Sequence, residues 1–133
     1  LVADQLTKSL VAASFMPGES LPLVPRVLHL TYVQNTGAAF GLFKGQHALF
    51  IVLSLVVIVW IVRECLAKRA MPRAMVWGYA LVLGGAAGNF LDRVRLGHVV
   101  DFIDLRVWPV FNVGDSAITI GVALLLSRAL RKT

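Results

Sequence analysis

Two long stretches without a charged side chain constrain this chain more than any other feature. Eighteen residues separate Lys44 from Arg63, and another eighteen separate Arg73 from Asp92, with no Lys, Arg, Asp or Glu in either stretch. As an α-helix, each stretch is about 27 Å long, close to the thickness of the hydrocarbon core of a bilayer. The chain is also 58% hydrophobic and 15% charged, with a mean hydropathy of +0.78. These features predict one integral-membrane domain over residues 1–133.

Positively charged residues gather at two places, which indicates how the chain lies in a membrane. The net charge is +6, and the residues that carry most of it flank the segment between the two apolar stretches or end the chain: Arg63, Lys68, Arg69, Arg73, Arg128, Arg131 and Lys132. Short cytoplasmic loops of membrane proteins carry an excess of Lys and Arg. We therefore expect this loop and both termini to be cytoplasmic, residues 19–46 to be extra-cytoplasmic, and nucleic acid not to be a partner.

The sequence of residues 1–15 predicts a helix that is too short and too charged to span a membrane by itself. Asp4 and Lys8 stand four positions apart, so they can pair on one helical face. We expect the chain to begin inside its first membrane helix, without that helix's front half, because it has no initiator Met and no basic leader. A surface helix with a solvated ion pair is the alternative.

Three further spans are predicted, over residues 47–62, 74–90 and 113–126. With the first helix they make a four-transmembrane-helix bundle of the all-α class. The alternating, β-branched residues 27–33 indicate a strand, so residues 19–46 predict a small extra-cytoplasmic β-sheet element. Gly84 and Gly88 form a face of small residues that lets membrane helices approach closely.

Three carboxylates cluster between residues 97 and 116, next to apolar stretches. A carboxylate at or inside a bilayer boundary costs roughly 2.5–3.5 kcal/mol, so Asp101, Asp104 and Asp115 mark a functional region. Asn112 and Asp115 fit the N-cap and N3 positions of the last helix, and a plain helix-start carboxylate is the alternative interpretation of Asp115. If the segment before that helix is extended, Asp101 and Asp104 point to opposite faces, so only one of them reaches Asp115.

Amide and guanidinium side chains accompany the carboxylates. Asn35 precedes a segment of small residues that includes Gly37, where an ordinary Asn-x-Gly turn is the alternative. Asn89, Asp92 and Arg93 are spaced i, i+3 and i+4, so they project from one helical face. Asp92 and Arg93 could form an ion pair at the membrane boundary, whereas a guanidinium held there could also bind a carbonyl or support a carboxylate.

Two adjacent Asp side chains suit the chemistry of an aspartic protease. They cannot both ionise cheaply, so one stays protonated and the pair supplies an acid and a base. No metal or other cofactor is expected, because His29, His47 and His98 lack the spacing of metal ligands. Two alternatives come from other classes: a small proton-coupled transporter or channel subunit that uses intramembrane carboxylates, and a non-catalytic assembly subunit.

Five ordered blocks of residues together resemble one known family. The blocks are Asp4-Gln5-x-x-Lys8, Asn35-x-Gly37-Ala38-Ala39-Phe40, Gly88-Asn89-x-x-Asp92-Arg93, Val99-Val100-Asp101-Phe102-Ile103-Asp104 and Phe111-Asn112-x-Gly114-Asp115. They resemble the bacterial lipoprotein signal peptidases, or signal peptidase II. The resemblance implies a four-helix aspartyl protease of the bacterial inner membrane, which removes the signal peptide from prolipoproteins just before a diacylglyceryl-modified cysteine. Gly114 departs from the Ala that this family usually has there, which should loosen the helix start.

The resemblance also implies roles for individual residues. Asp101 and Asp115 are the implied catalytic pair. The residues implied to bind substrate or line the site are Asn35, Gly37, Asn89, Arg93 and Asn112, and those implied to support the structure are Asp4, Lys8 and Asp92. The implied partners are diacylglyceryl-modified prolipoprotein signal peptides and membrane lipids. We expect a monomeric, multi-pass protein whose active site lies near the extra-cytoplasmic face.

Overall fold

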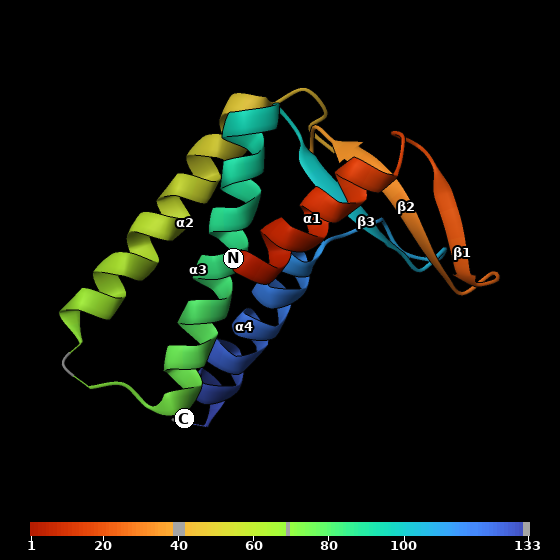
Figure 1. Cartoon of the computed structure of the whole chain (residues 1–133). Coiled ribbons are helices and arrows are strands. Elements are labelled where there is room, and N and C mark those ends of the chain that lie inside the picture. The colour runs from red at the N-terminus through yellow and green to blue at the C-terminus, as the bar shows by residue number, and fades with distance from the viewer. Residues whose placement is uncertain (39–41, 69, 132–133) are drawn as a thin grey trace.

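The computed structural model describes residues 1–38, 42–68 and 70–131. Along the chain, the elements are α1 (Val2–Ser14), β1 (Ser20–Val24), β2 (Leu28–Asn35), α2 (His47–Ala67), α3 (Arg73–Leu96), β3 (Val99–Asp104) and α4 (Val113–Leu130). Figure 1 shows α2, α3 and α4 as long helices that pack together, with the sheet beyond one end and α1 between the two parts. Ala39 and Phe40 of the predicted motif lie outside the described residues, as do Arg69 and Lys132 of the basic segments.

Three helices in the described part of the chain, and not the predicted four, are long and apolar enough to cross a membrane: α2, α3 and α4. α1 has 13 residues and is about 20 Å long, well short of the hydrocarbon thickness. Asp4 and Lys8 in α1 are 1% and 3% exposed, so this helix turns its charged side chains into the protein. Within the described residues, the structure therefore shows three spans and not the predicted four: the 13 residues of α1 bury Asp4 and Lys8 against the protein and expose Leu6 and Leu10 on the other face.

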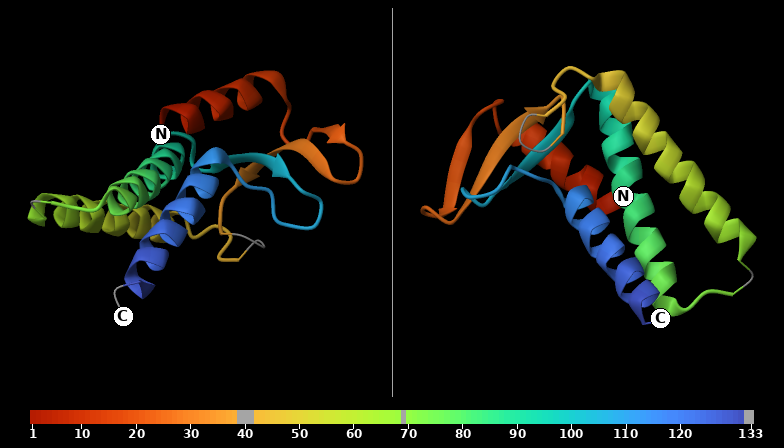
Figure 2. Two further views of the ribbon diagram at one scale, coloured as in Figure 1. Left: turned by 90° about the horizontal axis from the view of Figure 1, so that it is seen from below. Right: turned by 180° about the vertical axis from the view of Figure 1, so that it is seen from behind.

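The sheet has three antiparallel strands in the order β1-β2-β3, with β1 at the edge that lies farthest from the helices (Figure 2). The strand predicted over residues 27–33 is confirmed as β2. The third strand was not predicted, and it comes from the aspartate-rich segment. The fold is therefore mostly helical, with a small sheet as predicted. Strand pairing places Val33 opposite Asp101 and His29 opposite Asp104.

A buried apolar cluster holds α1 against this sheet. Val11 of α1 packs with Tyr32 of β2 and with Val100 and Phe102 of β3, and all four are less than a tenth exposed. Burying a side chain of this size contributes about 1.5–3 kcal/mol. The cluster therefore fixes α1 across β2 and β3, with its polar face toward α3 and α4.

Glycines in α3 allow both of its neighbours to come close. A Cβ atom at Gly85 would overlap the carbonyl oxygen of Gly114 in α4, and a Cβ atom at Gly88 would overlap the carboxylate of Asp4 in α1. The predicted face of Gly84 and Gly88 thus receives α1, while Gly85 receives α4. α3 is consequently the central element, and its last turns contact both the charged residues of α1 and the start of α4.

Candidate active site

The start of α4 is built by a capping box, as predicted. The Asn112 side chain accepts a hydrogen bond from the backbone N–H of Asp115 at 2.9 Å, and the Asp115 carboxylate accepts one from the backbone N–H of Asn112 at 3.1 Å. This reciprocal pair satisfies two donors at the helix start. Asp115 is only half-buried, so one side of its carboxylate remains accessible.

A loop after β3 returns the chain to the strand it has just left. The backbone of Phe111 exchanges hydrogen bonds with Ile103, at 2.8 and 3.1 Å, and accepts a further one from Phe102 at 3.0 Å. This return places Asn112 beside β3, although eleven positions separate it from Asp101. The contact could not be read from local sequence, because the intervening loop forms no helix or strand.

Asp101 lies on β3 and is 1% exposed. Its carboxylate accepts hydrogen bonds from two amide groups, Asn35 Nδ2 at 2.9 Å and Asn112 Nδ2 at 2.7 Å. Asn35 ends β2, and its position follows from the pairing of β2 with β3. The side-chain oxygen Oδ1 of Asn35 accepts a hydrogen bond from the backbone N–H of Gly37 at 2.9 Å. The side-chain NH₂ group of Asn35 is thereby left to donate to Asp101.

Asp104 points away from this site, as the alternation along an extended strand predicts. Its carboxylate accepts hydrogen bonds from the Thr31 hydroxyl at 2.7 Å and from the Arg106 backbone and guanidinium at 2.8 and 2.9 Å. Of the two carboxylates that the sequence alone could not separate, Asp101 is therefore the one that shares hydrogen-bonding partners with the start of α4.

Asn89 connects the two sides of the site. This α3 side chain is 7% exposed. Its Nδ2 atom donates to Asp115 Oδ1 at 2.8 Å, and its Oδ1 atom accepts from Asn112 Nδ2 at 3.1 Å. Because Asn112 also donates to Asp101, the two amides link the two carboxylates in one hydrogen-bonded network.

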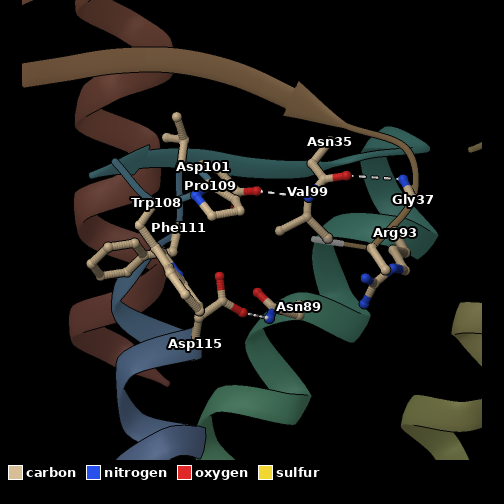
Figure 3. A pocket seen from close by; sticks show the side chains of 12 residues that line it. Asn35, Gly37, Asn89, Arg93, Val99, Asp101, Trp108, Pro109, Phe111 and Asp115 are labelled. Carbon is tan, nitrogen blue, oxygen red and sulfur yellow. Dashed lines mark hydrogen bonds between the residues drawn. The ribbon is translucent and has the colours of Figure 1, made fainter. Parts of the chain in front are cut away.

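A cavity of about 180 Å³ opens between these groups, as Figure 3 shows. It is lined by Asn35, Gly37, Ala38, Asn89, Arg93, Val99, Asp101, Trp108, Pro109, Val110, Phe111 and Asp115. Six of the seven residues that the resemblance places in the active site thus line one cavity, and the seventh, Asn112, lies fully buried behind it. No cluster of His, Cys, Asp or Glu within the described ranges could hold a metal ion.

Arg93 reaches this cavity from α3 without pairing with its neighbour Asp92. Its guanidinium lies 5.1 Å from the centroid of the Phe50 ring on α2 and donates a long hydrogen bond of 3.5 Å to Ser54. Asp92 turns to the other side of α3, where it meets Lys8. Asp92 therefore pairs with Lys8, and Arg93 contacts Phe50 and Ser54, instead of the two forming the ion pair considered from the sequence.

The sequence analysis missed the loop residues that cover one side of the cavity. Trp108, Pro109 and Phe111 stand between Asp101 and Asp115 and line the cavity with apolar surface. Trp108 is 59% exposed. The aromatic residues of this loop, which lies between two carboxylates in the sequence, were the signal that could have identified the loop as part of the site.

The environments of the two β3 carboxyl groups push their proton affinities apart. Burial and the nearby charge of Asp115 raise the pKa of Asp101, hydrogen bonds from Asn35 and Asn112 and the charge of Lys8 lower it, and together they bring it from 3.8 to about 7. For Asp104, burial also favours the neutral acid, but hydrogen bonds from Thr31 and Arg106 outweigh it and leave the pKa below its usual value. Asp101 is therefore suited to hold a proton near neutral pH.

The predicted pair of Asp4 and Lys8 is confirmed at 3.0 Å, and it is buried rather than solvated. Lys8 also pairs with Asp92 at 2.9 Å, and Gln5 donates to Asp92 at 3.0 Å. Asp4 accepts the backbone N–H of Gly114 at 2.8 Å, directly beside the α4 capping box. This charged cluster ties α1 to α3 and to the start of α4.

The chain is similar to known proteins over nearly its whole length. The sequence pattern of a family described as signal peptidase (SPase) II matches residues 1–131. A lipoprotein signal peptidase of Halothermothrix orenii is 45% identical over 126 residues, covering 95% of this chain and 86% of the relative. The relative with the same name from Syntrophomonas wolfei is 49% identical over 127 residues, covering 95% and 84%.

A solved structure described as a bacterial membrane enzyme has the same fold. It superposes with a TM-score of 0.91 at 34% identity, covering 98% of this chain and 82% of that one. The five sequence blocks, the paired carboxylates and the extent of these matches lead to one conclusion. The chain belongs to the signal peptidase II family.

Proposed function

We propose that this protein is an aspartic endopeptidase of the membrane that removes signal peptides from prolipoproteins, just before a diacylglyceryl-modified cysteine. Family membership supports this activity. The observation that carries the chemistry is the arrangement of Asp101 and Asp115, which line one cavity and share a network of amide hydrogen bonds. The transporter or channel alternative has no support among these relatives.

In the proposed reaction, Asp115 is the ionised carboxylate and Asp101 is the protonated one. The helix start and two hydrogen-bond donors favour a negative charge at Asp115, while burial favours the neutral acid at Asp101. Asp115 removes a proton from water as the water oxygen attacks the scissile carbonyl carbon. Asp101 donates its proton to the carbonyl oxygen.

The tetrahedral intermediate then collapses. One hydroxyl of the intermediate returns a proton to Asp101 as the carbonyl re-forms, the C–N bond breaks, and the amide nitrogen leaves with the proton that Asp115 took from water, so no covalent enzyme intermediate is needed. Asn35, Asn89 and Asn112 hold the two carboxylates in register through the hydrogen bonds described above, and Gly37 orients Asn35. In this proposal, the fork of Arg93 donors binds the substrate backbone at the edge of the cavity.

A second cavity is evidence that the substrate has an apolar portion. It has a volume of about 500 Å³, adjoins the first cavity at Trp108, Phe111 and Asp115, and continues along the first turns of α4 to Ile120. Its lining is mainly apolar, which suits the hydrophobic portion of a lipidated signal peptide. In this proposal the substrate enters from the membrane and places its scissile bond next to Asp115.

The remaining parts of the proposal concern the setting of the enzyme. Residues 1–133 form a single integral-membrane peptidase domain, which acts as a monomer among membrane lipids of the bacterial inner membrane. The basic segments after α2 and at the end of α4 favour a cytoplasmic location for the α2–α3 loop and the C-terminus. The expectation that the N-terminus is also cytoplasmic would need a fourth span, which the described residues do not show. The cavity lies near the opposite end of these helices, beside the sheet. In this proposal the active site is therefore at the extra-cytoplasmic face.

The experiment is to purify Asp101→Asn, Asp115→Asn and the control Asp104→Asn, and to follow release of the signal peptide from a lipidated prolipoprotein. Each amide has nearly the same volume as the acid, so all three proteins should fold. The first two variants should not cleave, because neither acid can take both roles, while Asp104→Asn should retain activity. Normal cleavage by Asp115→Asn would contradict the aspartic mechanism.

A further inference from the structure

The two ends of the Asn89 amide have different partners. Oδ1 accepts hydrogen bonds from Lys8 Nζ at 2.8 Å and from Asn112 Nδ2 at 3.1 Å, whereas Nδ2 donates to Asp115 Oδ1 at 2.8 Å. Asn89 is 7% exposed and has little water to replace any of these partners. The orientation of this one amide therefore determines whether Asp115 receives a donor from α3.

The opposite orientation of Asn89 would have no suitable partners. It would place an NH₂ group against the Lys8 ammonium and the Asn112 NH₂ group, all of which are donors, and would place a carbonyl oxygen against the Asp115 carboxylate. Asn112 cannot reverse to relieve this conflict, because its own Oδ1 accepts the backbone N–H of Asp115 and its NH₂ group donates to Asp101. Asn112 and Lys8 therefore jointly select the observed orientation.

Lys8 is placed to exert this control from outside the cavity. Its ammonium is 3% exposed and has three close acceptors: Asp4 at 3.0 Å, Asp92 at 2.9 Å and Asn89 at 2.8 Å. An ammonium has three protons, so each acceptor can receive one. The two carboxylates account for the anchoring of α1, and the third proton is directed at the amide that serves Asp115.

We propose that Lys8 is a positioning residue for the carboxylate pair, which acts by holding Asn89 in the orientation that donates to Asp115. The inference rests on the proposed peptidase function. Lys8 does not line the active-site cavity and in this proposal does not contact the substrate. The charged groups that contact the Asn89 amide are Lys8 from α1 and Asp115 from α4, while Asp101 is linked to it through Asn112 and Asp92 through Lys8.

Removing Lys8 alone would leave Asp4 and Asp92 buried without their cation, so the test uses an Asp92→Asn background. The variant Asp92→Asn keeps Lys8 and its bond to Asn89 and is the matched control. The double variant Lys8→Met with Asp92→Asn has the same net charge in this cluster as the wild type. Relative to the control, we expect kcat on a lipidated prolipoprotein to fall by about tenfold or more, with KM unchanged within about twofold.

A double-mutant cycle tests whether Lys8 acts through Asn89. In the same background, Asn89→Ala should lower kcat, and adding Lys8→Met to Asn89→Ala should have no further effect, because the amide that Lys8 orients is gone. Additive losses, or a double variant with the kcat of the Asp92→Asn control, would overturn the proposal. A wild-type protein that does not cleave would instead refute the proposed function, so the two failures are distinguishable.

A measurement on the wild-type protein covers the case in which a variant does not fold. The side-chain amide of Asn89 can be assigned in a ¹⁵N spectrum by its absence from Asn89→Gln. Both protons should exchange slowly with water, and the one that donates to the Asp115 carboxylate should be shifted downfield. Rapid exchange, or chemical shifts like those of an exposed Asn amide, would overturn the proposal.

Discussion

Asn35 offers a direct way to perturb the proton held by Asp101. Its Nδ2 atom donates to Asp101 Oδ2 at 2.9 Å, and this hydrogen bond stabilises the ionised carboxylate. The proposed mechanism requires Asp101 in its protonated form, so cleavage by the wild-type enzyme should decline as the pH rises above about 7. The variant Asn35→Ala removes the donor and should make the proton harder to lose.

The size of this effect follows from the geometry. A hydrogen bond to a charged group contributes about 1.5–3 kcal/mol, and 1.36 kcal/mol corresponds to one pH unit. The pKa of Asp101 should therefore rise, which would move the alkaline limb of the pH–rate profile upward by about one to two pH units. Asp101 is 1% exposed, so water has little room to replace the lost donor.

The assay is kcat/KM for a lipidated prolipoprotein in detergent, measured from about pH 5 to pH 10. Gln34→Ala is the matched control, because Gln34 is the exposed neighbour on the same strand and its amide donates to Tyr32, at 3.3 Å, instead of Asp101. The control should leave the alkaline limb where the wild type has it. An Asn35→Ala limb that stays in place or moves to lower pH would refute the assignment of the proton to Asp101.

Three further predictions concern binding, packing and orientation. Arg93→Lys should lower turnover about tenfold in a folded protein, because an ammonium cannot reproduce a planar fork over the Phe50 ring; wild-type turnover would reduce Arg93 to a boundary charge. Gly85→Ala should destabilise the protein by about 1–3 kcal/mol, measured by thermal unfolding, because the added methyl group would push α3 away from α4. The control Ala80→Val, at an exposed position of the same helix, should not destabilise it. Equal melting temperatures of the two variants would contradict the packing argument. A tag after Thr133 should be reached by protease only from the cytoplasmic side of vesicles, and access only from the other side would reverse the proposed topology.

Local sequence predicted the elements whose formation depends on neighbouring residues. The apolar stretches are helices that are long enough to span, and β2 covers the strand predicted over residues 27–33. Asn112 and Asp115 form the capping box that their spacing indicated. The separation of Asp101 from Asp104 also followed from the period of an extended strand, although the sequence could not show which of them faces Asp115.

Contacts between distant segments were beyond the reach of local patterns. The burial of Asp4 and Lys8 depends on Gly88, which leaves room for the Asp4 carboxylate, and on Asp92, which supplies a second anion. The helix that carries them therefore packs through its polar face, while Leu6 and Leu10 lie exposed on the other side, and the described residues show three spans instead of the expected four. A helical wheel drawn for α1 alone cannot distinguish this buried cluster from a solvated one.

The sequence alone was enough to predict the membrane character of this protein, its principal helices and, through five ordered blocks, its family. These properties depend on composition and on residues close together along the chain. The tertiary structure was needed to show that Asn35, Asn89 and Asn112 join the two carboxylates, and that Lys8 faces Asn89. Those contacts arise from the pairing of β2 with β3, the loop that returns Asn112 to β3, and the close approach of helices at glycines. Each depends on relations between segments whose separation along the chain carries no local signal.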